Sequence, residues 1–189
     1  MKTKGKTYQN WIEAAYWEFA CCGPDFSLKA LSEKTSLPRA TLYYHFDGKE
    51  SLVNELLRHH ELKSKAYFAE IKTNVKHLIP DLYKVMFKYK GEVLFHRQLL
   101  KNSHIESFYC LYRDVNNTSL NILLPHIKAI FESKSSDSDL IEFYHTLTDA
   151  WYTRIKTNDL SVDTMISLAV EIMENTMGLY KSKILQKSI

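Results

Sequence analysis

The chain has 189 residues, of which 45% are hydrophobic and 25% are charged, and its formal net charge is +3. This composition is typical of a globular protein whose buried core needs no disulfide bonds or metal ions to stabilise it. No run of about 18 apolar residues and no apolar segment behind the basic N-terminus is present, which argues against a membrane span and a secretory signal. We therefore expect a cytoplasmic protein, and its 5 Gly and 4 Pro favour helices over short strands.

Three short helices are predicted near the N-terminus. The first spans about residues 8–22, where apolar side chains recur at helical spacing until Gly23 and Pro24. Ser27 is the expected N-cap of the second helix, and Pro38 is the expected first residue of the third. Polar and aromatic residues crowd that third helix: Arg39, Thr41, Tyr43, Tyr44 and His45. Two short helices joined by a tight turn are typical of a helix-turn-helix motif, whose second helix enters the major groove of DNA.

The remaining elements are also predicted to be helices. A long helix begins after Asp47, the expected N-cap, and runs to about Lys72, with Glu50 completing a capping box. It is too long to belong to the N-terminal module alone, so we expect it to join that module to the rest of the chain. Further helices are expected at about 75–90, 92–102, 106–132, 138–156 and 161–186.

The three cysteines have no zinc-type spacing. Adjacent Cys21 and Cys22 are expected to pack at the buried end of the first helix, because free cysteine behaves as a small hydrophobe. Redox sensing by this pair is the alternative. We expect no metal and no cofactor.

A pattern of apolar, small and polar positions extends over about residues 8–55. It consists of Ala15, Phe19, Gly23, Ser27, Leu28, Leu31, Leu37, Thr41, Leu42, Tyr43, Phe46, Lys49 and Leu52. This pattern resembles the N-terminal signature of TetR-family transcriptional regulators. Two departures concern the turn: Ser36 stands where the family has a glycine, and Leu37-Pro38 stands where a serine or threonine often caps the recognition helix, so that Ser36 is an alternative cap.

The resemblance implies an all-α fold with two domains. Residues 1–50 would form a three-helix helix-turn-helix DNA-binding domain, and residues 51–189 a helical domain for effector binding and dimerisation. The long fourth helix would connect them. The basic residues Lys2, Lys4 and Lys6 form an arm before the first helix that could contact DNA.

Individual roles follow for the predicted recognition helix. Arg39 can donate two parallel hydrogen bonds to guanine O6 and N7, which is worth roughly 1–3 kcal/mol of base discrimination. Ala40 either permits close approach or contacts a thymine methyl, and His45 faces a base or a phosphate. The resemblance implies phosphate contacts for Thr41, Tyr43 and Lys49. The full predicted DNA-binding set is Ser27, Pro38, Arg39, Ala40, Thr41, Tyr43, Tyr44, His45 and Lys49. The alternatives are a merely solvated Arg39 and a half-buried core role for Tyr43.

One short recognition helix reads few base pairs, so a homodimer on a palindromic site is expected. The last two helices carry apolar stripes that would form its interface. The predicted dimer residues are Leu140, Tyr144, Leu147, Ile172, Met173, Thr176 and Tyr180. Packing of these stripes in the core of their own subunit is the alternative.

Aromatic residues in the remaining helices are expected to line a pocket for a small, partly apolar or anionic effector. The predicted ligand-binding residues are Phe87, Phe95, Phe108, Tyr112 and Trp151. An ordinary aromatic core is the alternative. These expectations together describe a homodimeric repressor of a palindromic operator that is controlled by a small-molecule effector.

Two other functions are alternatives to a ligand-controlled repressor. A DNA-bound adaptor would recruit another protein through its C-terminal domain and bind no small molecule. An all-α enzyme is disfavoured, because the sequence has no glycine-rich phosphate loop, no Gly-x-Ser-x-Gly, no His-Glu-x-x-His and no Cys-x-x-Cys.

Overall fold

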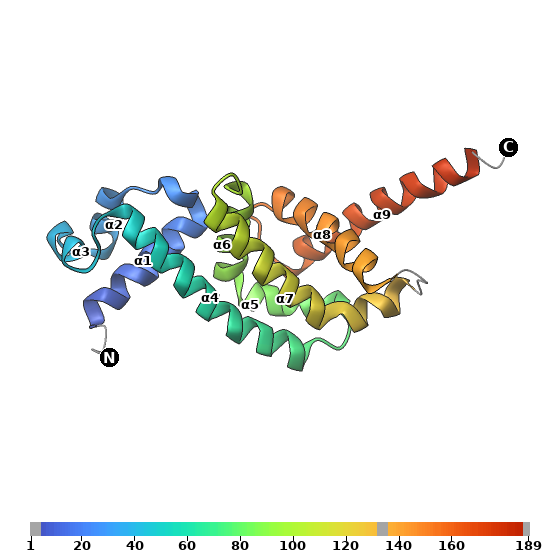
Figure 1. Ribbon diagram of the computed structural model, residues 1–189, viewed down its shortest axis with the longest axis horizontal. Helices are drawn as coiled ribbons and strands as arrows, with labels where there is room; N and C mark the ends of the chain where they lie inside the picture. The colour runs from blue at the N-terminus through green and yellow to red at the C-terminus, as the bar shows by residue number, and fades with distance from the viewer. Residues whose placement is uncertain (1–4, 132–135, 187–189) are drawn as a thin grey trace. The chain divides into compact units, whose positions relative to one another are not determined.

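The computed structural model describes residues 5–131 and 136–186, and within these ranges no residue lies in a β-strand. Helices follow one another along the chain (Figure 1). They are α1 (Lys6–Cys22), the 3₁₀ turn η1 (Gly23–Asp25), α2 (Leu28–Thr35), α3 (Arg39–His45), α4 (Lys49–Asn74), the irregular turn η2 (Leu78–Leu82), α5 (Tyr83–Lys88), α6 (Lys90–Lys101), α7 (Glu106–Phe131), α8 (Asp137–Arg154) and α9 (Val162–Gln186). The all-α prediction is therefore confirmed. None of the described helices is both long enough and apolar enough to cross a membrane.

The chain divides into two compact units. Unit 1 contains residues 1–67 and 89–115, and unit 2 contains residues 68–88 and 116–189. Helices α4 and α7 each contribute residues to both units. The functional boundary predicted after residue 50 stays a prediction.

Unit 1 is built around α1, which packs against α2, α3 and α6. The side chains of Trp11 and Phe19 from α1 are fully buried, and Phe95 from α6 stacks on Phe19 with ring centroids 4.2 Å apart. Gln98 of α6 donates from Nε2 to the carbonyl of Cys21 at 3.0 Å. This bond satisfies a carbonyl group in the last turn of α1, which the helix itself leaves without a partner.

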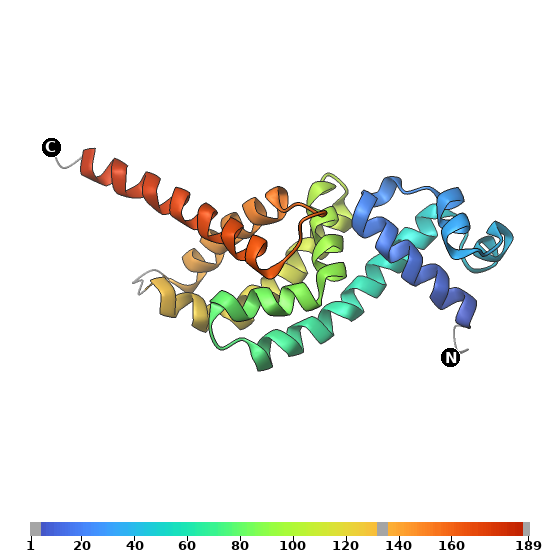
Figure 2. The same cartoon turned by 180° about the vertical axis from the view of Figure 1, so that it is seen from behind.

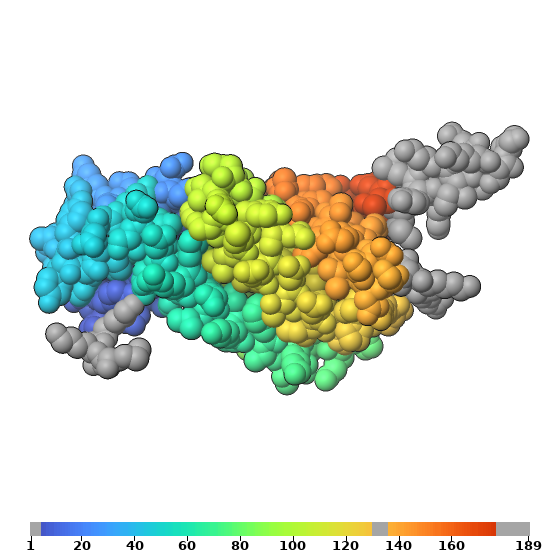
Figure 3. Space-filling model, viewed as in Figure 1, coloured from blue at the N-terminus to red at the C-terminus, as the bar shows by residue number. Residues whose placement is uncertain are grey.

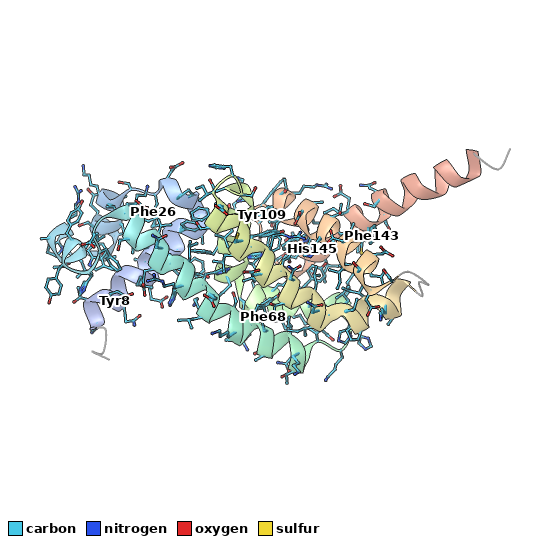
Figure 4. The ribbon with its side chains drawn as sticks, in the orientation of Figure 1. Tyr8, Phe26, Phe68, Tyr109, Phe143 and His145 are labelled. Atoms are coloured by element: carbon cyan, nitrogen blue, oxygen red, sulfur yellow. The ribbon has the colours of Figure 1, made fainter. Side chains whose placement is uncertain are left out.

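Unit 2 is built around α9, which packs against α8 and α5, and Figure 2 shows α8 and the first turns of α9 side by side. Trp151 of α8 is 5% exposed and donates from its indole N–H to the carbonyl of Met165 in α9 at 3.0 Å. His145 of α8, labelled in Figure 4, contacts α7 through Asn116 and Asn117. Both apolar and polar side chains therefore join the helices of this unit.

Two expectations about these elements are wrong. The single helix predicted over 75–90 is interrupted, because Ile79 adopts extended backbone angles (φ −117°, ψ 125°). Pro80 explains this break, since proline disfavours helical geometry in the residue before it. Cys21 and Cys22 are exposed rather than buried, because the stripe of α1 that faces the core passes through Phe19 and Ala20.

Candidate nucleic-acid interface

Side-chain hydroxyl groups stabilise the start of α2 and the turn between α2 and α3. Ser27 caps α2 as predicted, with its Oγ accepting a hydrogen bond from the Ala30 N–H at 3.3 Å. Helix α2 ends at Thr35, and the C-cap residue Ser36 adopts left-handed angles (φ 54°, ψ 26°). Ser32 Oγ then donates to the Leu37 carbonyl at 2.6 Å. Ser36 thus performs the turn that glycine makes most easily, and it is not the N-cap of α3.

Helix α3 begins one residue later than predicted. Pro38 occupies the N-cap position with extended angles (φ −60°, ψ 134°), and Arg39 is the first helical residue. The Pro38 carbonyl accepts the Thr41 N–H at 2.9 Å and the Thr41 hydroxyl at 2.8 Å. These two bonds close the first turn of a helix of 7 residues.

The two faces of α3 differ sharply. Leu42 is 1% exposed and Phe46, the residue after the helix, is 4% exposed, so both anchor α3 in unit 1. On the other face Tyr43 is 50% exposed and Tyr44 is 85% exposed, and Arg39 and Ala40 are exposed as well. Figure 3 shows the surface that α2 and α3 present, coloured blue to cyan. A set of hydrogen-bonding side chains is therefore available to a partner.

Arg39 and Tyr43 lie one helical turn apart and contact each other. Arg39 Nη2 donates to the Tyr43 hydroxyl at 3.1 Å, and its guanidinium carbon lies 5.9 Å from the centroid of the Tyr43 ring. The Tyr44 ring contacts His45 edge-on, with ring centroids 5.0 Å apart. His45 is partly exposed. These contacts reduce the freedom of otherwise mobile side chains.

Lys49 is the first residue of α4, and the Leu52 N–H bonds to the Gly48 carbonyl at 3.2 Å. Gly48 therefore takes the N-cap position predicted for Asp47. The Lys49 ammonium lies 4.9 Å from the centroid of the Phe26 ring, and Phe26, labelled in Figure 4, is 3% exposed. A lysine beside the positive end of a helix dipole is a favourable place for an anion such as a phosphate.

Two residues of α1 that sequence reasoning did not assign to the interface hold α3 in place. Trp11 donates from its indole N–H to Thr41 Oγ1 at 3.2 Å. Tyr8, labelled in Figure 4, stacks on Phe46 at 5.3 Å and meets the edge of His45 at 5.7 Å. Their spacing of three residues on α1 was the available signal, since it places them on one helix face.

The residues predicted to bind an effector are divided between the two units. Phe95, Phe108 and Tyr112 are buried in unit 1, where Phe19 contacts both phenylalanines with centroids 4.2 and 5.5 Å apart. Phe87, which is 39% exposed, and Trp151 belong to unit 2. Their role in ligand binding stays a prediction.

The aromatic core of unit 1 also contains two buried histidines that are not among the predicted site residues. His60 stacks on Phe95 with centroids 4.5 Å apart, and His96 stacks on Tyr112 at the same distance. Burial lowers the pKa of His60 well below its ordinary value, and it lowers the pKa of His96 to about 3. Both imidazoles are therefore neutral near pH 7.

Most residues of the predicted dimer interface pack within unit 2. Leu140, Tyr144, Leu147 and Ile172 are each between 5% and 8% exposed in the single chain. Met173 and Thr176 of α9 are partly exposed. The side chain of Tyr180 lies outside the described residues. Their part in dimerisation stays a prediction.

Comparisons with known proteins give a family match that includes α2 and α3. Residues 12–56 match the family described as "Bacterial regulatory proteins, tetR family". No curated protein sequence matches the chain significantly.

Three solved structures illustrate the similarity in fold. A transcriptional regulator ("TerR/AcrR family") from Aquifex aeolicus VF5 is 18% identical, with a TM-score of 0.59 over 92% of this chain and 99% of that one. GusR from Salmonella enterica is 15% identical, with a TM-score of 0.57 over 95% and 98%. A tetR-family transcriptional regulator from Streptomyces coelicolor is 17% identical, with a TM-score of 0.56 over 100% and 99%.

Proposed function

We propose that this chain, whose residues 12–56 match the tetR family of bacterial regulatory proteins, is a homodimeric repressor that reads a palindromic operator with α3. The family and the fold are those of DNA-binding transcriptional regulators. The observation that carries the finer proposal is the surface of α3, on which Arg39, Tyr43 and Tyr44 are exposed beside the anchors Leu42 and Phe46.

Base recognition is assigned to the first turn of α3. Arg39 is exposed, and its contact with Tyr43 keeps the guanidinium close to the helix. From there it can donate two parallel hydrogen bonds to a guanine in the major groove. Ala40, also exposed, lets the helix approach closely or contacts a thymine methyl.

Phosphate binding is assigned to residues in the second half of α3 and to residues that flank it. Lys49 offers an ammonium at the start of α4, and Tyr43 and Tyr44 offer hydroxyl groups. Ser27 and Pro38 lie at the starts of α2 and α3, where backbone groups come close to DNA in a helix-turn-helix complex. His45, partly exposed at the end of α3, completes the set. Such contacts fix register on the duplex and carry no sequence information directly.

Dimerisation is proposed because α3 has only 7 residues and one short helix discriminates poorly against the competing sites of a genome. A two-fold dimer doubles the site that is read. Met173 and Thr176 are the partly exposed members of the predicted interface. Control by a small-molecule effector is proposed on the family resemblance and on the aromatic side chains, among them Phe95 and Tyr112, that are buried in unit 1.

The deciding experiment is selection of random duplex DNA by the purified protein at near-physiological salt, followed by light scattering of the complex. Enrichment of a palindrome bound by two chains is the expected result. Enrichment of a single half-site bound by one chain would overturn the dimer. Salt-sensitive binding without any enriched sequence would overturn sequence-specific recognition by the free protein.

A further inference from the structure

The Thr41 hydroxyl lies in a chain of hydrogen bonds inside unit 1. It accepts the indole N–H of Trp11 at 3.2 Å and donates to the Pro38 carbonyl at 2.8 Å. A threonine hydroxyl carries one hydrogen. In this arrangement that hydrogen is directed at the Pro38 carbonyl and not at an acceptor outside the protein.

We propose that Thr41 positions the recognition helix in this protein instead of binding a DNA phosphate, and that Trp11 acts through it as a positioning residue for base recognition. The inference rests on the proposed function of α3 in DNA binding. It reverses the role that the family resemblance implies for Thr41.

A phosphate oxygen only accepts hydrogen bonds, so Thr41 would have to release Pro38 in order to bind one. Other side chains face no such exchange. The Tyr43 hydroxyl accepts from Arg39 and keeps its own hydrogen for a further acceptor. Tyr44 is 85% exposed, and Lys49 lies at the start of α4. Phosphate binding therefore falls to these neighbours at lower cost.

The bond from Trp11 attaches α1 to the first turn of α3. Tyr8, three residues earlier on α1, stacks on Phe46 and touches the edge of His45, at the opposite end of α3. The Tyr8 hydroxyl also donates to Glu55 Oε1 in α4 at 2.6 Å. One face of α1 thus holds both ends of α3.

Such attachments matter because a helix of 7 residues is not stable by itself and takes its direction from tertiary contacts. Bidentate contacts to a base require a fixed orientation, whereas the charge attraction that supplies binding to random DNA does not depend on the base sequence. Loosening the Trp11–Thr41–Pro38 chain should therefore reduce the preference for the operator over random DNA and leave binding to random DNA almost unchanged.

The test uses Trp11→Phe, which removes the indole N–H and keeps a ring, and Thr41→Val, which removes the hydroxyl and keeps the shape. Dissociation constants are measured on the selected operator and on random duplex DNA at one salt concentration. We expect each variant to lower the ratio of the dissociation constant on random DNA to that on the operator about fivefold. This change corresponds to the roughly 1 kcal/mol of one hydrogen bond. The double variant should be no worse than Thr41→Val alone, because Thr41→Val already removes the bond from Trp11 together with the bond to Pro38.

Two further variants separate the alternatives. Thr41→Ser keeps the hydroxyl and should retain the wild-type ratio. Tyr44→Phe removes a hydroxyl assigned to phosphate and should weaken binding to both DNAs alike. The proposal is overturned if Thr41→Val weakens both DNAs equally while Trp11→Phe changes neither.

Hydrogen exchange of the indole N–H groups tests the bond without DNA. The indole of Trp11 should exchange slowly in the wild type and in Thr41→Ser, and faster in Thr41→Val. Trp151, whose N–H bonds to the Met165 carbonyl, and Trp17, which is 39% exposed, serve as slow and fast references that Thr41 should not affect. If the wild type enriches no DNA sequence, the proposed function fails. The exchange measurement alone then decides whether Thr41 bonds to Trp11. Fast exchange of the Trp11 indole N–H in the wild type would show that this hydrogen bond does not form.

Discussion

The Tyr16 hydroxyl and His60 Nδ1 hydrogen-bond at 2.8 Å in the core of unit 1, where each side chain is 1% exposed. The His60 ring lies 5.8 Å from that of His96, which is 4% exposed. Burial lowers the pKa of His60, and the positive charges of His96, His59 and Lys63 would lower it further. The core of unit 1 is therefore built for two neutral imidazoles, and protonation of either would place a charge among aromatic rings.

Acid should consequently destabilise the protein. In the unfolded chain histidine has a pKa near 6.5, whereas the pKa of His96 is about 3 in the folded chain. Below pH 6.5 the unfolded state binds more protons, so stability is complete above that pH and falls as pH decreases towards the folded value. Each of the two histidines contributes up to ~1.4 kcal/mol per pH unit. Denaturant unfolding between pH 7.5 and pH 5 measures this slope.

His96→Phe keeps a ring and removes one of the two protonation sites. The slope of the unfolding free energy against pH should therefore decrease by the contribution of one histidine, up to ~1.4 kcal/mol per pH unit. Phe95→Leu is the matched control, because Phe95 stacks on His60 and has no ionisable group. Phe95→Leu should lower the free energy of unfolding by an amount that does not change with pH. An unchanged slope in His96→Phe would show that His96 does not contribute to acid sensitivity.

Ser36 offers a stabilising substitution in the turn between α2 and α3. Its φ of 54° lies in the left-handed region, where a residue with a Cβ is disfavoured by roughly 1–2 kcal/mol. Ser36→Gly should relieve part of this strain and raise stability by about 0.5–1 kcal/mol, the remainder being offset by the greater freedom of glycine in the unfolded chain. Thermal unfolding measures the change.

Ser36→Val provides the opposite test at the same position, because a β-branched side chain tolerates the left-handed region worst. We expect a lower melting temperature than that of the wild type. Equal melting temperatures for Ser36→Gly and Ser36→Val would mean that the turn is not strained at this residue.

Local signals in the sequence predicted most of the N-terminal helices. Ser27 precedes a helix and caps it, and Gly23 follows one and takes a positive φ of 71°. Ser36, expected to stand where the family has a glycine, takes a positive φ of 54°. These features depend on a few adjacent residues, so they can be predicted from the sequence alone.

Contacts between distant residues were not predictable in the same way. A stripe of apolar residues shows which face of α1 is buried but not that the indole N–H of Trp11 meets Thr41. His60 and His96 lie on α4 and α6, and nothing in their sequence surroundings indicates that their rings approach within 5.8 Å. The assignments to the effector site and the dimer interface depend on such distant relations and stay predictions.

His145 joins α7 and α8 through a buried polar network that should contribute to the stability of unit 2. Its Nε2 lies 2.7 Å from Asn117 Oδ1 and its Nδ1 lies 3.3 Å from Asn116 Nδ2. A neutral imidazole with its hydrogen on Nε2 satisfies both contacts. His145→Phe would remove them while Asn116, 4% exposed, stays buried. We expect a loss of about 1–3 kcal/mol in denaturant unfolding.

Thr146→Ala is the neighbouring control on α8, because Thr146 is exposed and its hydroxyl bonds only back to the Glu142 carbonyl within the same helix at 3.2 Å. Its stability should stay within about 0.5 kcal/mol of the wild type. If His145→Phe behaves like Thr146→Ala, the network does not stabilise α7 against α8.

Arg39 and Lys49 are expected to act differently on DNA. Arg39→Ala removes the side chain assigned to a base, so binding to the selected operator should weaken by roughly 1–3 kcal/mol while binding to random duplex changes little. Lys49→Ala removes a charge assigned to a phosphate. It should weaken both DNAs similarly and reduce the slope of log K against log salt concentration by about one. Lys65→Ala is the matched control, since Lys65 is an exposed lysine later on α4, and it should change neither value. Equal effects of Arg39→Ala and Lys49→Ala on operator and random DNA would contradict the division of roles, because a residue that reads a base must discriminate between sequences.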